Sequence, residues 1–235
     1  HLEADGVIVD PDRPTTVKTR VIAERQQVVR FDREGREPIG ASVAERIGES
    51  LVERSGRSSA VLVSDYAKGA LTPDVVGRAI ALAGQLGIPS LVNAKPASLG
   101  WIRGATVATV NQSEAHAFSG DPGFLAEEQI REAGDTLREA VGVRTLVVTR
   151  GPEGMMVWSE GVEPLQVEAH KVPVYDVAGA GDTVVSVLTA AFATGSDNKT
   201  ATWLAAAAAA VIVGKLGVAT CSAEELRQSV ETWFA

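Results

Sequence analysis

The residues that most directly suggest chemistry form a short turn in front of a long apolar segment. In the sequence VYDVAGAGDT, residues 174–183, a β-type run over 172–177 stops at two glycines and Asp182, and an apolar segment follows. A tight turn with Asp182 as the helix N-cap explains this pattern, because a carboxylate accepts hydrogen bonds from the first amides of a helix. An anion cradle explains it equally well, since those amides and the helix dipole would point at a bound phosphate. The turn alone leaves both interpretations open.

If an anion binds at this turn, each residue of the turn has a distinct task. Gly179, Ala180 and Gly181 could direct successive N–H groups at a phosphate. Asp182 would lie beside the transferring phosphoryl group, where it could accept a proton from an attacking hydroxyl. No Lys-Ser/Thr pair follows the glycines, as a Walker A loop would require, and the G-x-G-x-x-G dinucleotide spacing is also missing.

Other polar residues follow the apolar runs that we predict to be strands. Ligands bind at the carboxyl ends of the strands in open α/β sheets, so these residues are candidates for one site. Asn111 and Glu114 suit a hydrated Mg²⁺, which prefers one or two protein oxygens plus water and substrate phosphate. A helix with an acidic first turn explains that pair too. The full set is Asp65, Lys68, Asn93, Lys95, Asn111, Glu114 and residues 149–154.

Two cations near the start of the sequence are spaced as on a β-strand. Lys18 and Arg20 are two residues apart, so both would project from one face, about 7 Å from each other. They could grip an anionic substrate, with the arginine making a bidentate contact to a phosphate. Charged residues that protect an exposed edge strand from aggregation are the alternative explanation.

Strands and helices are predicted to alternate along most of the chain. A β-hairpin is expected over 14–34, with its turn at 24–26, because β-branched residues alternate with polar neighbours there. From residue 43 onward, helical patterns alternate with short apolar runs, which implies a parallel sheet covered on both faces. The expected strands cover 59–64, 89–94, 105–111, 144–151, 155–158 and one or two stretches of 162–177. The expected helices cover 43–54, 72–87, a short stretch around 114, 126–140, 182–194, 199–213 and 222–233.

Composition narrows the classes of protein and partner. The chain has 235 residues and a formal net charge of −8, which argues against a nucleic-acid surface. The longest charge-free apolar run, 205–214, is about half of what a membrane-spanning helix needs, so we expect a buried helix and no membrane segment. The single cysteine, Cys221, cannot form an intramolecular disulfide, which indicates a reducing, cytoplasmic environment.

Several segments together resemble the PfkB/ribokinase-like carbohydrate kinases. DVAGAGDT resembles the C-terminal signature of that family, usually written D-T-x-G-A-G-D. The similarity is greatest to the kinase modules of bacterial enzymes that phosphorylate heptose 7-phosphate. It is carried, in order, by RPTTVKTRVIAERQQVVRFDRE (13–34), VSDYAKGALT (63–72), NQSEA (111–115), TRGPEGM (149–155), VYDVAGAGDT (174–183) and VGKLGVAT (213–220).

The resemblance implies a fold and a reaction. The fold is a ribokinase-like three-layer α/β/α domain over 1–235, with 14–34 as a β-hairpin lid and 43–235 as the nucleotide-binding core. The reaction is ATP- and Mg²⁺-dependent phosphoryl transfer to a small-molecule sugar phosphate, best matched by heptose 7-phosphate going to heptose 1,7-bisphosphate. The lid often forms the dimer contact in such kinases, so a homodimer is expected.

The resemblance also implies roles for individual residues. Asp182 would be the catalytic base, with Gly179, Ala180 and Gly181 as the anion hole. Asn111 and Glu114 would serve the metal, directly or through water. The substrate would be held by Lys18, Arg20, Asp65 and Lys68, and the ATP by Lys95, Asn111, Thr149, Gly151 and Gly154.

The sequence also departs from the family pattern. Family members begin with a strand that carries an aspartate, followed by a Gly-Gly segment, and neither has a counterpart here. We therefore expect the sheet to lack a central strand and to expose an apolar edge. Asn93-Ala-Lys95 replaces Asp-Pro-Lys, and an alanine run, 205–210, covers a place where asparagine is common. Two alternatives follow: a PfkB kinase for another sugar or a nucleoside, and a catalytically impaired binding relative.

Overall fold

One six-stranded sheet organises the chain, and the computed structural model describes residues 4–23, 26–125 and 129–234. The strands lie in the order β3-β4-β5-β6-β7-β8. The first four are parallel, whereas β7 pairs antiparallel with both β6 and β8. This confirms the expected mostly parallel sheet. The bounds are β3 (Val61–Ser64), β4 (Ser90–Asn93), β5 (Val107–Asn111), β6 (Thr145–Thr149), β7 (Met155–Ser159) and β8 (Val162–Val167).

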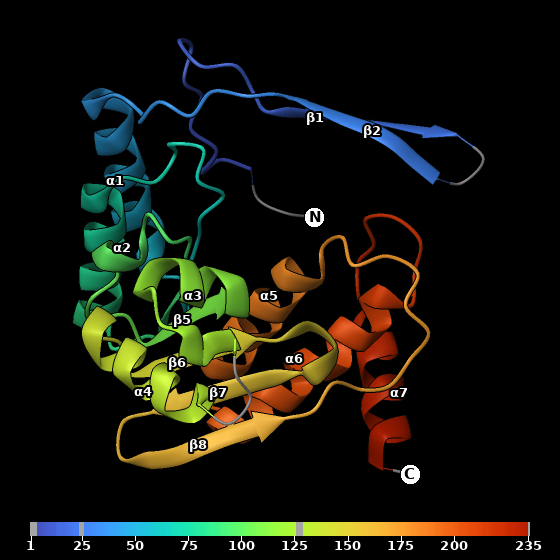
Figure 1. Cartoon of the computed structure of the whole chain (residues 1–235). Coiled ribbons are helices and arrows are strands. Elements are labelled where there is room, and N and C mark those ends of the chain that lie inside the picture. Colours follow the sequence, from blue (N-terminus) through green and yellow to red (C-terminus); the bar gives the residue numbers. More distant parts are fainter. Residues whose placement is uncertain (1–3, 24–25, 126–128, 235) are drawn as a thin grey trace.

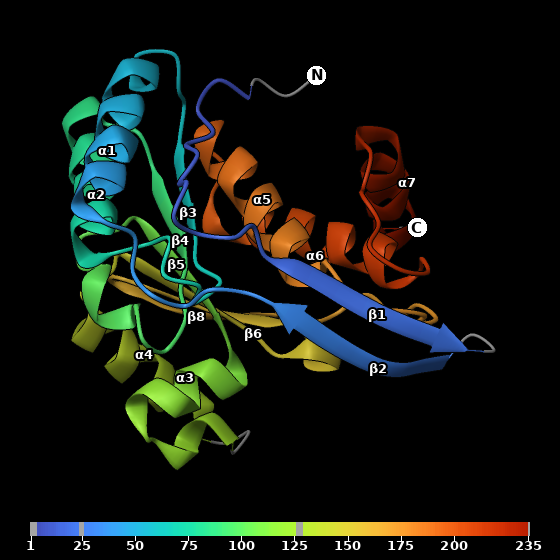
Figure 2. The ribbon, with the colours of Figure 1, turned by 90° about the horizontal axis from the view of Figure 1, so that it is seen from above.

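Helices cover both faces of this sheet, which gives three layers (Figures 1 and 2). Helices α2, α3 and α4 pack on one face, and α1 packs against α2. Helices α5 and α6 pack on the other face, and α7 lies against α6. The bounds are α1 (Ala41–Ser55), α2 (Pro73–Leu86), α3 (Gln112–Ser119), α4 (Ile130–Val141), α5 (Ala180–Ala193), α6 (Asn198–Val213) and α7 (Ala223–Phe234).

The central strands read as continuous apolar runs because both of their faces are buried. In β6, Leu146 and Val148 belong to the core under α2 and α4, whereas Val147 belongs to the core under α5 and α6. All three side chains are fully buried. Successive residues of a strand point to opposite faces, so a sheet with two covered faces needs apolar residues at every position.

Local signals correctly predicted where two helices begin. The Thr72 hydroxyl accepts a hydrogen bond from the Val75 amide at 3.3 Å, and Pro73 is the first residue of α2. At the start of α7, the amide of Ser222 donates to the Glu225 carboxylate and the amide of Glu225 donates back to Ser222. These reciprocal contacts form a capping box and satisfy amides that have no partner inside the helix.

The alanine run lies in α6 and is mostly buried. Ala205, Ala207 and Ala208 are fully inaccessible to solvent. Small side chains there allow α6 to approach α5 and the sheet closely, and the expected buried helix is confirmed. None of the described helices combines the length and the apolar character that crossing a membrane would require.

The N-terminal hairpin forms a small sheet of its own and projects from the body (Figures 1 and 2). Strands β1 (Val17–Ala23) and β2 (Gln26–Arg33) pair antiparallel, as predicted. Lys18 pairs with Asp32 and Arg20 with Arg30, so these four polar residues share one face. Of the expected turn, residues 24–25 lie outside the described part.

The expected exposed edge of the large sheet is strand β3. Among the described strands, it pairs with β4 alone. Leu62 in this strand is 39% exposed. An apolar parallel strand therefore lies at the sheet edge, where such residues are usually covered.

The strand predicted within 172–177 is wrong, because β8 ends at Val167 and no strand follows it before α5. The amide of Tyr175 donates to the Val213 carbonyl at the end of α6, at 2.7 Å, instead of joining a ladder. Pro173 has no amide hydrogen to donate. The segment is extended but joins the end of α6, and its apolar side chains Val174 and Val177 are exposed instead of buried in a sheet. Helix α5 also begins at Ala180, two residues before the predicted start.

A glycine in α4 lets the helix pack against a buried tryptophan, and this contact can be tested. A Cβ on Gly134 would lie 2.1 Å from a ring atom of Trp158, which is 1% exposed. Gly134→Ala should lower the free energy of unfolding by about 1–3 kcal/mol, the usual cost of overpacking a core. Chemical denaturation measures this change.

The matched control is Gly77→Ala in α2, where a Cβ meets nothing within 4 Å. It should raise stability by about 0.5–1 kcal/mol, because alanine is the better helix former. Equal effects of the two substitutions would contradict the proposed packing role of Gly134.

Candidate active site

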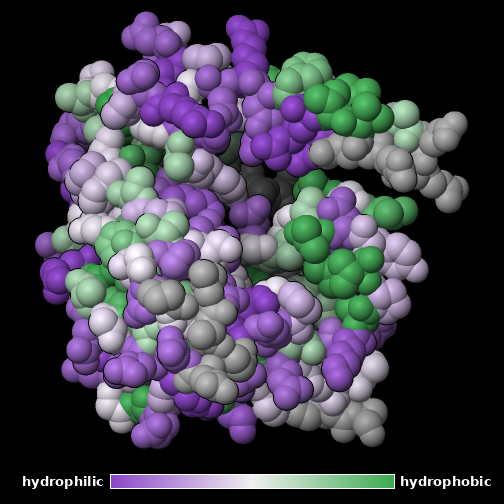
Figure 3. Space-filling model, in the orientation of Figure 1, coloured by the Kyte–Doolittle hydropathy of each residue, from purple (hydrophilic) through white to green (hydrophobic). Residues whose placement is uncertain are grey.

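Three adjoining cavities lie along the carboxyl ends of the parallel strands. The central cavity has a volume of about 160 Å³ and is bordered by the ends of β4, β5 and β6 and by the start of α5. The lid cavity, about 310 Å³, lies between the hairpin and the loop after β3, where Figure 3 shows a hollow below the hairpin. The long cavity, about 610 Å³, lies between the loop after β6 and helices α5 and α6. Shared lining residues join them: Tyr66 borders the lid and central cavities, and Thr149, Gly181 and Val184 border the central and long cavities.

The start of α5 lies where the cavities meet. Gly179 is the N-cap residue, with a φ of 85°, a backbone conformation that favours glycine. The Ala180 amide donates to the Val177 carbonyl at 3.2 Å. The amide of Gly181 has no hydrogen-bond partner within the described residues, and Gly181 borders both the central and long cavities. The first turn therefore offers an unpaired donor and a helix dipole to an anion.

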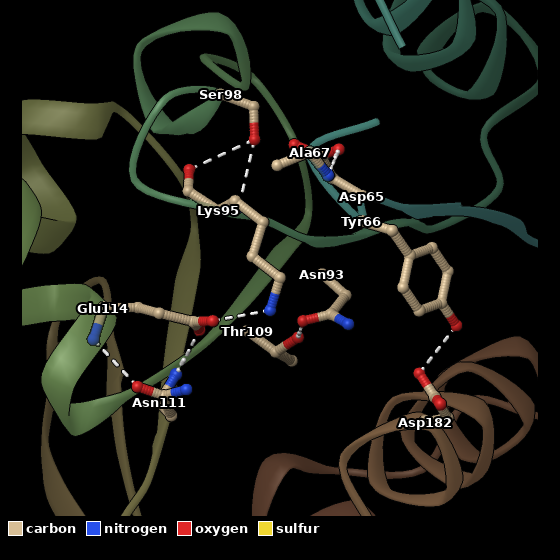
Figure 4. A network of polar contacts seen from close by, with 10 residues as sticks. All are labelled: Asp65, Tyr66, Ala67, Asn93, Lys95, Ser98, Thr109, Asn111, Glu114 and Asp182. Atoms are coloured by element: carbon tan, nitrogen blue, oxygen red, sulfur yellow. Dashed lines mark hydrogen bonds and ion pairs between the residues drawn. The ribbon is translucent and has the colours of Figure 1, made fainter. Parts of the chain in front are cut away.

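Asp182 is on that first turn and points into the central cavity (Figure 4). Its Oδ1 accepts a hydrogen bond from the Tyr66 hydroxyl at 2.8 Å. Partial burial and the adjacent Asp182 carboxylate raise the pKa of Tyr66 above its ordinary value, so this phenol stays protonated at neutral pH. Our sequence analysis did not select Tyr66. The available signal was its position between Asp65 and Lys68 in a strand-end loop.

A polar network lies opposite Asp182 across the central cavity (Figure 4). The Lys95 ammonium contacts Glu114 Oε1 at 2.5 Å. The amide of Asn111 donates to Glu114 Oε2 at 2.9 Å, and the amide of Glu114 donates to Asn111 Oδ1 at 2.8 Å. Asn111 and Glu114 thus form a capping box for α3 while bordering the cavity. Both explanations of this pair, as helix cap and as site residues, fit the structure.

The donor set fits a hydrated Mg²⁺ and does not fit a cation held by protein alone. The described residues include no group of three or more His, Cys, Asp or Glu side chains that could hold a metal. Mg²⁺ usually keeps several waters and uses one or two carboxylates plus substrate phosphates. Asn111 and Glu114 could supply the protein's part, directly or through water.

The lid cavity brings together three of the four predicted substrate residues. Lys18, Asp65 and Lys68 border it, whereas Arg20 lies further out along the hairpin and borders none of the three cavities. Asp65 is 6% exposed, and its Oδ1 accepts a hydrogen bond from the Ala67 amide at 2.7 Å. The Lys68 ammonium is 2.6 Å from Glu34 Oε1, and this contact lowers the pKa of Glu34.

The long cavity contains the predicted nucleotide residues. Thr149, Gly151 and Gly154 border it from the loop after β6, and Ala206, Ala209 and Ala210 border it from α6. A Cβ on Gly154 would lie 2.0 Å from the Val167 carbonyl oxygen, so this position requires glycine. The alanine run thus forms one wall, because small side chains leave room for a flat apolar group. The other two predicted ATP residues, Lys95 and Asn111, border the central cavity instead.

Comparisons with known proteins agree with this geometry. A family model described as "pfkB family carbohydrate kinase" matches residues 1–225. The bifunctional protein HldE of Geobacter sulfurreducens is 41% identical over 225 residues, which are 96% of this chain and 46% of that protein. The HldE protein of Gluconobacter oxydans is 40% identical over 229 residues, 97% of this chain and 47% of that protein. The chain therefore spans less than half the length of these relatives.

Solved structures share the fold. Phosphofructokinase-2 from Escherichia coli, in complex with potassium, superposes with a TM-score of 0.80 at 18% identity, covering 95% of this chain and 72% of that chain. Arabidopsis thaliana ribokinase, complexed with ribose and ATP, gives a TM-score of 0.71 at 19% identity, covering 94% and 70%. The expected ribokinase-like α/β/α fold is confirmed.

Proposed function

Because this chain belongs to the pfkB family of carbohydrate kinases, we propose that it transfers the γ-phosphoryl group of ATP to a hydroxyl of a sugar phosphate. One observation carries the proposal. An unpaired amide, Gly181, and a carboxylate, Asp182, lie on the same helical turn, where the central and long cavities adjoin. The amide suits the charge of a phosphoryl group, and the carboxylate suits the proton of the attacking hydroxyl.

The long cavity is the proposed site of the nucleotide. Its alanine and valine walls suit an adenine ring, and its opening toward Gly181 would lead the phosphates to the start of α5. Lys95 and Asn111 in the central cavity would then contact the phosphates. Bound Mg²⁺, held by Asn111 and Glu114 directly or through water, would neutralise phosphate charge.

The proposed reaction is a direct displacement. Asp182 takes the proton from the acceptor hydroxyl as its oxygen bonds to the γ-phosphorus. The bond between that phosphorus and the bridging oxygen of ADP breaks, and the electron pair leaves with ADP. The Gly181 amide and the dipole of α5 stabilise charge on the transferred group, in an orientation that is set before the reaction.

The acceptor would lie in the lid cavity, between the hairpin and the loop after β3. Lys18 and Lys68 border this cavity, and both ammonium groups could contact a substrate that already carries a phosphate, although Lys68 is also paired with Glu34. Heptose 7-phosphate, converted to the 1,7-bisphosphate, is the acceptor that the sequence resemblance favours. The single cysteine, Cys221, is a free thiol, which suits the reducing cytoplasm where we place the reaction.

The role of Asp182 can be tested by removing its charge. Asp182→Asn keeps the shape of the side chain but cannot accept a proton. We expect kcat to fall by about a hundredfold or more, the usual contribution of a general base. The measurement is ADP release by the full-length protein with a panel of sugar phosphates that includes heptose 7-phosphate. Undiminished turnover would refute the role assigned to Asp182. If the unmodified protein turned over no sugar, the alternative of a catalytically impaired binding protein would be favoured.

The two hairpin cations, Lys18 and Arg20, can be tested separately for binding to the phosphate that the sugar substrate already carries. Lys18→Ala should raise the KM for the sugar phosphate about tenfold, because a charge-assisted hydrogen bond to phosphate is lost. The KM for ATP should not change. Arg20→Ala should have a smaller effect, since Arg20 borders none of the three cavities.

The matched control is Lys199→Ala, because this lysine lies over Trp203 at the start of α6. If Lys18→Ala leaves sugar-phosphate binding at the control's level, the unphosphorylated-sugar alternative gains support.

We further propose that the hairpin mediates a homodimer through its outer face. Val17, Val21, Val29 and Phe31 share the face opposite Lys18 and are between 43% and 59% exposed. Hydrophobic atoms gather over this part of the hairpin in Figure 3. An apolar strand face in water favours association with a second copy.

Phe31→Asp should convert the dimer to monomer, because a charge would be buried at the centre of that face. Sedimentation velocity measures the change. Val52→Asp on α1 is the control, since Val52 is also exposed, at 65%, but lies on another element. A protein that is monomeric without any substitution would contradict the dimer.

A further inference from the structure

The loop between β3 and α2 contacts both the lid and the proposed base. Tyr66 from this loop borders the lid cavity and the central cavity, and Figure 4 shows its ring directed at Asp182. The two residues are 116 positions apart in the sequence, yet the hydroxyl lies 2.8 Å from Asp182 Oδ1. No other donor to the Asp182 carboxylate is found in the described part of the chain. One oxygen is therefore held while the other stays available.

This division suits a general base. A carboxylate on an unrestrained side chain rotates freely, and each wrong orientation reduces the fraction of productive encounters. A donor on Oδ1 fixes the plane of the carboxylate and leaves Oδ2 to receive the proton. The other titratable groups that border the central cavity, Lys95 and Glu114, are paired with each other on its opposite side. Tyr66 is thus the described side chain that donates a hydrogen bond to the Asp182 carboxylate.

The loop that carries Tyr66 is held in one conformation. The buried Asp65 carboxylate accepts the Ala67 amide, and the Asp65 amide donates to the Asn93 carbonyl at 2.9 Å. Ala67 adopts a φ of 52°, a left-handed conformation that is uncommon for alanine. Such a conformation persists where surrounding contacts impose it.

The same loop is tied to the base of the hairpin. Lys68 pairs with Glu34, just after β2, and the Arg13 guanidinium donates to the Lys68 carbonyl, just before β1. The Ile39 amide donates to the Gly69 carbonyl at 2.9 Å. A Cβ on Gly69 would lie 2.1 Å from the Glu37 carbonyl oxygen, so the two backbones are in close contact. A displacement of the lid base would therefore be transmitted to Tyr66.

We propose that Tyr66 is a positioning residue for Asp182, and that the Asp65–Gly69 loop makes this positioning depend on the lid. The inference rests on the proposed kinase function and deepens it. An acceptor phosphate that draws Lys18 and the hairpin toward the cavity would shift Glu34. The Lys68–Glu34 pair would then pass this movement to the loop that carries Tyr66, and Tyr66 would orient the Asp182 carboxylate. Without a seated acceptor, the orientation of the base would be less well defined. The loop would thus link acceptor recognition to phosphoryl transfer.

The first test separates turnover from binding. Tyr66→Phe in the full-length protein should lower kcat about tenfold, because one hydrogen bond to a charged group is lost. The KM for ATP should stay unchanged. Tyr175→Phe is the matched control, since Tyr175 is 64% exposed and its described hydrogen bond uses the backbone. A Tyr66→Phe variant with the control's kcat would overturn the proposal.

The second test needs no activity. The difference in tyrosinate absorbance between the unmodified protein and Tyr66→Phe reports the ionisation of Tyr66 alone. The Asp182 carboxylate contributes to the raised pKa of Tyr66, together with burial, so Asp182→Asn should lower the pH at which Tyr66 ionises. An unchanged titration would overturn the direct contact.

The third test addresses the link to the lid. Glu34→Gln weakens the contact with Lys68 and should lower kcat. The double variant Glu34→Gln with Tyr66→Phe should have the same kcat as Tyr66→Phe alone, because both substitutions act through the same contact. Glu231→Gln, which weakens an exposed ion pair with Arg227 on α7, is the control. Independent, multiplicative losses would refute the coupling.

These outcomes are distinguishable from failure of the proposed function. If the unmodified protein phosphorylates no sugar, the proposed function is wrong, and if Asp182→Asn keeps full activity, the assigned role of Asp182 is wrong. If Asp182→Asn is inactive while Tyr66→Phe and Glu34→Gln behave as their controls, only the further inference fails.

Discussion

The site depends on how the first turn of α5 satisfies its backbone. The first amides of any helix lack partners inside the helix, and a buried, unpaired donor costs free energy. Here Gly179 turns the chain, Ala180 pairs back to Val177, and Gly181 faces the cavities with its amide unpaired. The same turn carries Asp182. An anion would satisfy the amide, so one local feature of helix geometry would supply both the phosphate-binding and the proton-accepting parts of the proposed site.

The sheet determines which polar residues lie near the first turn of α5. Parallel strands end at one edge, so the loops after β3, β4, β5 and β6 deliver their polar residues to the same place. Along their length, by contrast, the central strands are apolar at nearly every position, because helices bury both faces of the sheet. Polar residues are therefore confined to the strand ends, and this explains why they were recognisable in the sequence. The small residues of α6 contribute in another way, because they leave the long cavity open beside the start of α5.

The lid is tied to the core through the loop after β3. That loop carries a buried carboxylate at its start, a strained alanine in its middle and a lysine paired with the lid base. These contacts hold the two ends of the loop, Asp65 in the core and Lys68 at the hairpin base, in a defined position relative to each other. Tyr66 lies between them and donates to Asp182, and in the proposed reaction this contact would connect substrate recognition to the reacting group. The exposed apolar face of the hairpin, pointing away from the site, is then free for contact with a second copy.

The sequence by itself determined the features that depend on near neighbours. The period of the apolar pattern predicted the sheet, the helices and the hairpin, and local residue types predicted that helices begin after Thr72 and Ser222. The tertiary structure alone decided which distant groups meet. It paired Tyr66 with Asp182 and Lys95 with Glu114, left Arg20 outside the three cavities, and joined residues 172–177 to the end of α6 instead of to the sheet. The physical reason is that propensity and capping act within a few residues. A hydrogen bond between side chains 116 positions apart exists only because the sheet and α5 bring the two backbones together.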